Sequence, residues 1–298
     1  MRVFVTGASG WIGSATVDEL LSSGHEVLGL VRSEAAVATL EAQGATALRG
    51  DLDDLDALRK GADGAEAVIH LANKHDWSDP AESNRAERTA VETVGNVLVG
   101  SDRPFLFASG VAGIVPGRAS TELDRSPYSG PDAPRGGAEN LAMEYVDKGV
   151  RSISLRFAPT VHGDGDHGFV HHLVAGARTA GASGYVGDGS TGWSAVHRSD
   201  AARMVRLGLE QAPAGTLLHA VAEPSVPSRT IAEAIGRGLG VPTAPMTPEE
   251  ATQRLGFLGS FFAMDLSASS TITQELLGWT PTGPTLLEDL ESGSYFRS

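Results

Sequence analysis

Short apolar runs with β character alternate with stretches of helical periodicity along the first half of the chain. The pattern predicts strands at residues 2–6, 26–31, 45–49, 66–71, 104–108 and 151–156. It predicts helices at residues 12–23, 34–43, 54–60, 80–100 and 136–148. This alternation is typical of a Rossmann-type α/β fold, a doubly wound parallel sheet with helices on both faces. Ligands of such folds bind at the carboxyl ends of the strands.

The amino-acid composition changes after Arg156, because residues 157–195 are rich in Gly, His and Asp. Helical stretches at 200–211 and 228–238 then flank a strand at 217–221, and a helix near 248–254 precedes an apolar segment at 255–264. We expect a nucleotide-binding domain over residues 1–160 with a returning segment near 196–222. Residues 161–298 would form a smaller substrate-binding cap.

Composition narrows the classes of partner. The chain of 298 residues is 41% hydrophobic and carries a net charge of −14, which argues against nucleic acids and anionic membrane surfaces. It has no cysteine, which removes disulfides and thiolate nucleophiles and fits a reducing compartment. No secretory signal pattern opens the chain and no apolar run is long enough to cross a membrane. We therefore expect a cytoplasmic protein.

A glycine-rich turn follows the first predicted strand and leads into the first predicted helix. Gly7 would allow the tight turn, Gly10 would let the backbone approach a pyrophosphate, and Gly13 would bring helix and strand close together. The helix N-terminus offers free N–H groups to an anion. The expected cofactor-binding residues of this turn are Gly7, Ser9, Gly10, Trp11, Ile12 and Gly13.

The end of the second strand predicts which dinucleotide is bound. NAD-selective proteins usually carry an acid there for the ribose 2′-hydroxyl, whereas this chain has Val31 and then Arg32. A guanidinium suits a 2′-phosphate, so we expect NADP(H) in preference to NAD(H). The alternative is that Arg32 is a solvated loop arginine. Further cofactor contacts are expected at the ends of the third and fourth strands, at Asp51, Leu52, Leu71 and Ala72, although either segment would also serve simply as a strand-end loop.

Several motifs together resemble the extended short-chain dehydrogenase/reductase family, of the NAD-dependent epimerase/dehydratase type. They are the glycine turn and residues 24–27, 155–163, 193–202 and 276–281. The resemblance covers nearly the whole chain and implies a nicotinamide cofactor, with Pro159 and Val161 in the loop that holds the nicotinamide. The predicted helices 80–100 and 136–148 resemble those that pair in family dimers, which favours a homodimer.

The chain departs from the family at its active site, which is a Ser or Thr together with Tyr-x-x-x-Lys. Ser109 stands where the family places its serine, but Gly136 and Asn140 stand at the positions of the tyrosine and the lysine. None of the four tyrosines has a lysine four residues further on. The chain is therefore identified as an atypical member, and the usual proton relay cannot be transferred to it.

Four residues are candidates to replace that relay. Ser109 would donate a hydrogen bond to the oxygen of a reacting carbonyl, or is simply a small residue at a strand end. Arg135 and Glu139 are spaced i, i+4 and would share one helix face. Arg135 would stabilise an alkoxide and Glu139 would bind the ribose or relay protons; the alternative is a surface ion pair. His162 lies in the expected nicotinamide loop. We expect no metal, because hydride transfer requires none.

The cap and its neighbouring loops supply the expected substrate contacts. These are His75, Tyr128, Phe169 and Trp193, whose apolar character favours a hydrophobic or aromatic small molecule, although Tyr128 and the cap aromatics would also serve as packing. The sequence thus favours an NADP(H)-dependent oxidoreductase that reduces a carbonyl. Two alternatives remain open: an epimerase or dehydratase that uses a bound cofactor transiently, and a non-catalytic NADP(H)-sensing regulator.

Overall fold

Seven parallel strands form the main sheet of the computed structural model, which describes residues 1–74 and 79–297. Their order across the sheet is β10 (Leu217–Ala220), β6 (Arg151–Phe157), β5 (Pro104–Gly110), β4 (Ala67–His70), β1 (Arg2–Thr6), β2 (Glu26–Val31) and β3 (Thr46–Arg49). The six strands predicted in the first half all form. Their apolar runs are typical of parallel strands covered on both faces.

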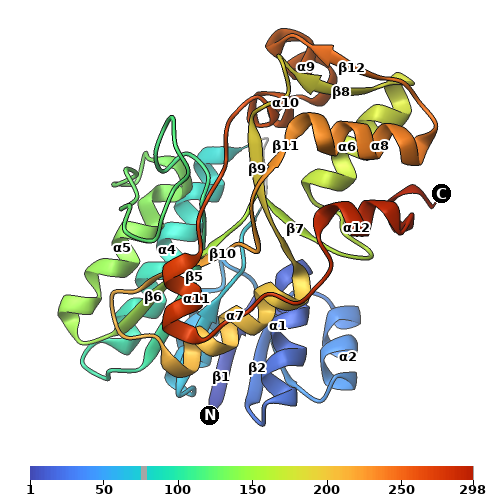
Figure 1. The fold of residues 1–298 in the computed structure, drawn as a ribbon. Helices are drawn as coiled ribbons and strands as arrows, with labels where there is room; N and C mark the ends of the chain where they lie inside the picture. The colour runs from blue at the N-terminus through green and yellow to red at the C-terminus, as the bar shows by residue number, and fades with distance from the viewer. Residues whose placement is uncertain (75–78, 298) are drawn as a thin grey trace.

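Helices cover both faces of this sheet (Figure 1). One face packs on α1 (Trp11–Ser22), α2 (Glu34–Ala42), α7 (Arg198–Gln211) and α11 (Thr271–Leu277). The other face packs on α3 (Leu55–Asp63), α4 (Pro80–Leu98) and α5 (Ala138–Glu144). Each face has its own apolar core, so the predicted doubly wound fold is confirmed.

The direction of the chain across the sheet reverses between β1 and β4. The strands after β1 extend one way, to β2 and β3, and the chain then crosses back so that β4, β5 and β6 extend the other way. The carboxyl ends of β1 and β4 therefore flank the topological switch point, where α/β folds bind their ligands.

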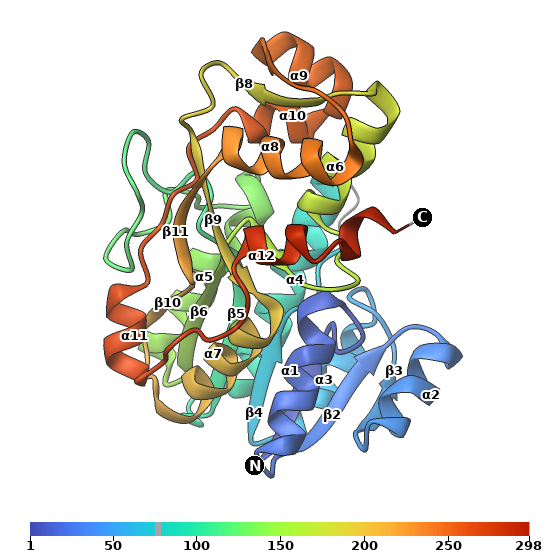
Figure 2. The same ribbon diagram turned by 45° about the vertical axis from the view of Figure 1, so that its right-hand side comes forward.

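The second half builds a smaller unit above the carboxyl ends of the strands (Figure 1, Figure 2). It contains two small sheets. One has three strands in the order β11 (Glu223–Pro227), β9 (Gly192–His197) and β7 (Thr160–His162), and the other pairs β12 (Thr243–Met246) with β8 (Ser183–Val186). Its helices are α6 (Phe169–Ala180), α8 (Ser228–Leu239), α9 (Pro248–Leu255), α10 (Phe257–Phe262) and α12 (Leu286–Glu291). Helix α12 lies between the other cap helices and α1 in both Figure 1 and Figure 2.

The predicted helix at 136–148 is shorter than expected and is preceded by a left-handed turn. Arg135, Gly136 and Gly137 have φ of +55°, +61° and +62° within the 3₁₀ segment η1 (Pro134–Gly137). Helix α5 can begin only after them, at Ala138, because left-handed residues cannot continue a right-handed helix. It ends at Glu144, before the short turn η2 (Val146–Lys148). One further 3₁₀ turn, η3 (Ser294–Phe296), follows α12.

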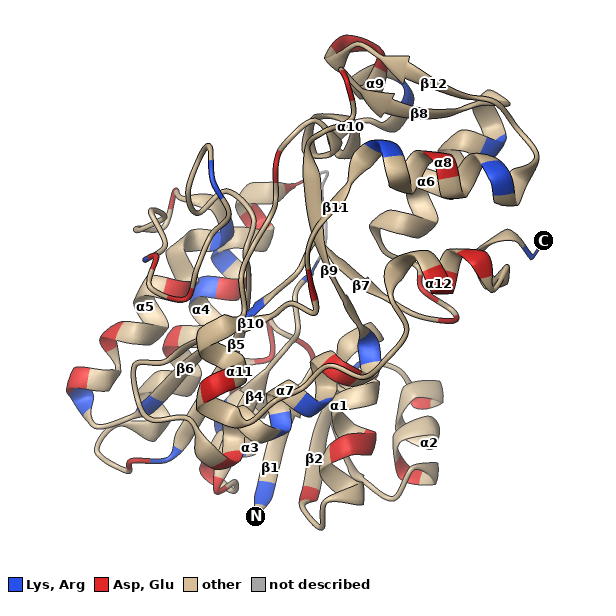
Figure 3. Cartoon of the chain, viewed as in Figure 1, with Lys and Arg blue, Asp and Glu red and all other residues tan. Residues whose placement is uncertain are grey.

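Acidic side chains lie on helices of both the sheet layer and the cap, for example α2 and α12 (Figure 3). Among the helices that the structure describes, none combines the length and apolarity needed to span a membrane.

Candidate active site

The glycine turn after β1 lies against the end of β4 and leaves no room for side chains. Gly7 has a φ of +70°, and a Cβ there would lie 2.8 Å from the amide nitrogen of Ala72. A Cβ on Gly13 would lie 1.9 Å from the carbonyl oxygen of Gly7. The glycines thus allow β1, α1 and the residues after β4 to meet at the switch point.

The N-terminus of α1 is available to an anion. Its N-cap is Gly10, which contributes no side-chain hydrogen bond, so the first-turn N–H groups are not capped by it. Trp11 donates from Nε1 to the carbonyl oxygen of Val161 at 2.7 Å, which joins the turn to strand β7. This bare, tightly packed turn at a helix N-terminus fits the pyrophosphate of a dinucleotide.

The residues expected at the adenosine end lie after β2 and β3. Arg32 is exposed directly after β2. Asp51 accepts hydrogen bonds at Oδ1 from the backbone N–H groups of Asp53 and Asp54, at 2.9 and 3.1 Å, and so shapes the turn before α3. Leu52 is buried in the core.

A pocket opens at the carboxyl end of β5. Four of the residues expected from the sequence line it: Ser109, Arg135, Glu139 and Tyr128. Its lining is Glu87, Ala108, Ser109, Ser126, Tyr128, Pro134, Arg135, Gly137, Ala138 and Glu139. The volume is about 30 Å³, which is room for a water molecule or a single functional group.

Ser109 and Glu139 are in direct contact at this pocket. Ser109 donates from Oγ to Oε2 of Glu139 at 2.9 Å. The other oxygen of Glu139 accepts from Ser154 Oγ at 3.0 Å and from Arg156 Nε at 2.7 Å. A carboxylate that is 8% exposed is thus held by three donors from β5 and β6.

The expectation that Arg135 and Glu139 share one helix face is wrong, and so is the alternative of a surface ion pair between them. Because the turn at Arg135 is left-handed, its side chain points away from α5 to Glu87 on α4, where Nε donates to Oε2 at 3.1 Å and Nη2 pairs with Oε1. Glu87 is buried and also accepts from Asn73 at 2.8 Å. The left-handed turn therefore brings Arg135 to the pocket by a route that helical spacing does not predict.

Asn140, at the position where the family resemblance places lysine, anchors the loop that carries Tyr128. Its Nδ2 donates to the carbonyl oxygens of Ser126 and Tyr128 and to Oγ of Ser129, at 3.0, 2.8 and 2.7 Å. Tyr128 donates its hydroxyl proton to the carbonyl oxygen of Gly113 at 3.1 Å. The loop is thereby fixed as one wall of the pocket.

His70, at the end of β4, is buried near this site. Its Nδ1 lies 2.9 Å from Thr6 Oγ1, and its Nε2 has no hydrogen-bond partner among residues 1–74 and 79–297. Burial, together with the charge of Arg135, lowers the pKa of His70 to about 4. The ring is therefore neutral near pH 7.

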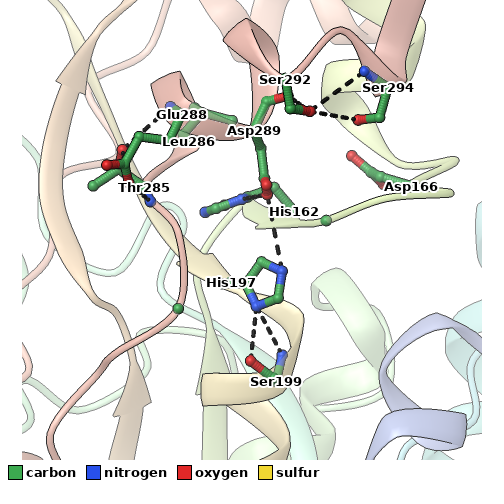
Figure 4. A network of polar contacts seen from close by, with 12 residues as sticks. His162, Asp166, His197, Ser199, Thr285, Leu286, Glu288, Asp289, Ser292 and Ser294 are labelled. Carbon is green, nitrogen blue, oxygen red and sulfur yellow. Dashed lines mark hydrogen bonds and ion pairs between the residues drawn. The ribbon is translucent and has the colours of Figure 1, made fainter. Parts of the chain in front are cut away.

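His162 lies apart from this cluster. It is fully buried in β7, with Nδ1 2.5 Å from Asp289 Oδ2 on α12 (Figure 4). Its Nε2 lies 3.8 Å from Glu223 Oε2. His197 Nε2 lies 4.0 Å from the same Asp289 oxygen. In the described residues, His162 contacts Asp289 of the C-terminal helix α12, Glu223 and His197, and these contacts do not connect it to Ser109. We do not retain it as an acid/base candidate.

The aromatic candidates for substrate contact belong mainly to the cap core. Trp193 is 0% exposed, packed against Phe262 and Phe169 with ring centroids 5.1 and 5.9 Å away. It cannot touch a substrate without opening the cap, which corrects the expectation for this residue. Phe169 is half-buried beside it. His75 lies outside the described residues.

Sequence reasoning missed Arg156 and Glu87. Arg156 is a charged residue within the buried stretch 152–157 of β6, and a charge at a buried strand position is a signal that a partner must exist. Glu87 gives no comparable signal, because an acid in a long polar helix is ordinarily solvated.

Comparison with known proteins supports the resemblance seen in the sequence. The model of the NAD dependent epimerase/dehydratase family matches residues 3–218. A Schizosaccharomyces pombe protein, "Uncharacterized protein C2A9.02", is 46% identical over 297 residues, which cover 99% of this chain and 100% of that protein. The 4-hydroxy-2-methyl-3-oxo-4-farnesyl-3,4-dihydroquinoline-1-oxide ketoreductase of Stigmatella aurantiaca is 28% identical over 225 residues, 72% of this chain and 66% of that protein.

A solved structure agrees with the fold. DesIV, a dTDP-glucose 4,6-dehydratase from Streptomyces venezuelae with NAD and TYD bound, matches with a TM-score of 0.78 at 20% identity. The match covers 99% of this chain and 97% of that chain. At this level of identity the likeness shows the fold alone.

Proposed function

The chain belongs to the NAD-dependent epimerase/dehydratase family, and from this premise we propose that it is an NADP(H)-dependent oxidoreductase that reduces the carbonyl group of a small organic molecule. The observation that carries the proposal is the joint position of two features. The bare glycine turn lies at the switch point, and Ser109 lies at the carboxyl end of β5, on the same edge of the sheet.

The cofactor would be held by the turn from Gly7 to Gly13, with Leu71 and Ala72 beside it and Pro159 and Val161 on the cap side. Arg32 would contact the 2′-phosphate, which is the basis for preferring NADP(H) over NAD(H). When bound, the nicotinamide supplies the hydride that reduces the carbonyl carbon.

Ser109 would contact the carbonyl oxygen, because its hydroxyl is the strand-end donor that lines the pocket. Arg135 lines the same pocket and would stabilise the negative charge that develops on that oxygen. Its charge is balanced by Glu87, which keeps the guanidinium in place when no substrate is present.

The charges around the pocket favour a neutral substrate. The guanidinium groups of Arg135 and Arg156 are each paired with a carboxylate, Glu87 and Glu139 respectively. An anionic substrate would therefore gain little net attraction there. Ala108, Pro134 and Ala138 supply apolar lining, and the small volume admits the reacting group while the body of the substrate lies outside.

The proposal is tested by following NADPH consumption optically with a panel of neutral ketones, aldehydes and imines, with NADH assayed beside it. We expect turnover of at least one carbonyl class and faster turnover with NADPH than with NADH. Tight NADPH binding without turnover of any compound would overturn the reductase proposal and favour a nucleotide-sensing regulator. Tightly copurified cofactor with no net consumption would favour an epimerase or dehydratase.

A further inference from the structure

The carboxylate of Glu139 connects the pocket to a fully buried charge. Its Oε2 accepts from Ser109, and both residues line the pocket. Its Oε1 faces β6, where Ser154 and Arg156 donate to it. One end of this chain of contacts is therefore open to a ligand and the other end lies inside the protein.

Arg156 is built into the interior at that inner end. Its guanidinium is 0% exposed, and its Nη1 donates to the carbonyl oxygen of Asp124 at 2.7 Å and lies 3.3 Å from Nε2 of His219. A guanidinium has no acceptor, so His219 must accept at Nε2 and carry its proton on Nδ1, which lies 2.7 Å from the carbonyl oxygen of Ser269. Burial, with a contribution from the Arg156 charge, lowers the pKa of His219 to about 4, so this histidine is neutral near pH 7.

The hydroxyl of Ser109 has one hydrogen, and this limits what it can do. When Glu139 is ionised, that hydrogen is directed to the carboxylate, as the structure shows. When Glu139 is protonated, the carboxylic acid can donate to Ser109 Oγ, and the serine hydrogen is then free for an oxygen in the pocket. The protonation state of Glu139 thus decides whether Ser109 donates a proton into the pocket or accepts one from it.

We propose that Ser109, Glu139 and Arg156 form a proton relay that takes the place of the family's Tyr-x-x-x-Lys, and this inference rests on the proposed function. As the carbonyl carbon gains its hydride, the electron pair of the C=O bond moves to oxygen, and Ser109 gives its proton to that oxygen. Glu139 returns a proton to Ser109 and becomes a carboxylate. Solvent reprotonates Glu139 after the alcohol leaves, and the steps reverse for oxidation.

Arg156 acts through Glu139 and is a positioning residue. It fixes the carboxylate so that Oε2 faces Ser109, and it compensates the charge that Glu139 gains in each reduction. Within the described part of the chain, the ionisable groups around Glu139 include Arg135 before α5, Glu87 on α4, Tyr128 in the pocket wall and His219 on β10. The charges of Arg135 and Glu87 offset each other.

The relay predicts opposite pH dependences for the two directions. Reduction requires protonated Glu139 and slows as the pH rises, whereas oxidation requires the carboxylate and accelerates through the same midpoint. Glu139→Gln removes the carboxyl group that returns a proton to Ser109. We expect the rate of reduction to fall roughly 100-fold or more and the pH midpoint to disappear from its profile.

Variants of Arg156 separate this relay from a purely structural ion pair. Arg156→Lys keeps the charge and should keep the midpoint close to that of the wild type. Arg156→Met removes the charge and should move the midpoint upward by about one pH unit or more, because a carboxylate without its cation holds its proton more tightly. Ser152→Ala is the matched control, since Ser152 is equally buried on the same strand and its hydroxyl has no partner in the part of the chain that the structure describes.

The proton on Glu139 can also be measured without any substrate. Infrared difference spectra recorded against pH, with Glu139→Gln to assign the carboxylic acid band, report its protonation directly. We expect the band to appear at higher pH in Arg156→Met than in Arg156→Lys. If Arg156→Met does not fold, Ser154→Ala, which removes one donor to Oε1, should move the band in the same direction.

Two results would overturn the relay. One is reduction by Glu139→Gln at the wild-type rate with an unchanged pH profile. The other is a Glu139 band that is insensitive to Arg156 and to Ser154. If no carbonyl compound is turned over, the proposed function fails, but the infrared titration still decides whether the Glu139 proton is coupled to Arg156.

Discussion

Arg135 forms a two-point ion pair with Glu87 of α4, although Glu139 stands four residues after it in the chain. The partner is buried and the pair lines the pocket, so its loss leaves a guanidinium without its carboxylate at the site. We expect Glu87→Gln to lower the free energy of unfolding by about 2 kcal/mol, less than for a fully buried pair because Arg135 is partly exposed. Urea denaturation measures this.

Glu82→Gln on the same helix is the control for this substitution. Glu82 is partly exposed, with 44% of its side chain accessible, and pairs with Arg85 and Lys74. Its loss should leave the urea midpoint unchanged, because exposed ion pairs contribute little. If Glu87→Gln were no more destabilising than Glu82→Gln, the Arg135–Glu87 pair would not contribute to the stability of the fold.

The left-handed turn before α5 predicts a strict requirement for glycine at position 136. An alanine there would adopt an unfavourable positive φ, and its Cβ would lie 2.5 Å from the carbonyl oxygen of Asn84. Gly278→Ala is the matched control, because Gly278 also has positive φ but open space around it. We expect the control to cost about 1 kcal/mol and Gly136→Ala at least twice as much, measured by thermal or urea unfolding. Equal costs would mean that α4 and the turn do not approach as closely as described.

The assignment of Arg32 to the 2′-phosphate predicts a selective loss of affinity. Charge-assisted hydrogen bonds contribute about 1.5–3 kcal/mol, so Arg32→Ala should weaken NADPH binding roughly 10- to 100-fold. NADH binding should hardly change, because NADH has no 2′-phosphate. Fluorescence titration measures both dissociation constants.

Arg59→Ala serves as the control for Arg32, since Arg59 is an exposed arginine on α3 paired with Asp56. It should leave both affinities unchanged. If Arg32→Ala weakened both nucleotides equally, or neither, the proposed preference for NADP(H) would lose its basis.

Buried His70 predicts that acid weakens the fold. Its pKa is lowered from 6.5 to about 4, so between pH 4 and pH 6.5 this histidine is mainly protonated in the unfolded chain and mainly neutral in the folded chain. The free energy of unfolding therefore falls as the pH drops below about 6.5, by about 2 kcal/mol at pH 5 for this group. Urea unfolding at pH 7 and pH 5 should show a smaller difference for His70→Asn than for the wild type. An identical difference in the two proteins would assign the acid sensitivity elsewhere.

The sheet could be predicted from the sequence because parallel strands that are buried on both faces consist of uninterrupted apolar runs such as Val3-Phe4-Val5. It could not predict the partners of charged groups. Helical spacing joined Arg135 to Glu139, but two glycines redirect the backbone between them. Glu139 instead meets Arg156, 17 residues away on a strand, and His162 meets Asp289, 127 residues away. Contacts of this kind depend on how elements pack, which local patterns do not encode. The cofactor residues remain a prediction.

The central claim is that Ser109 stands at the reacting carbonyl of an NADP(H)-dependent reductase. Its most direct test is the transfer of deuterium from C4-deuterated NADPH to a carbonyl compound, detected in the alcohol by mass spectrometry, for the wild type and Ser109→Ala at equal NADPH occupancy. We predict labelled alcohol from the wild type and a rate roughly 100-fold lower for Ser109→Ala. No label in any alcohol despite bound NADPH, or equal rates for the two proteins, would contradict the account.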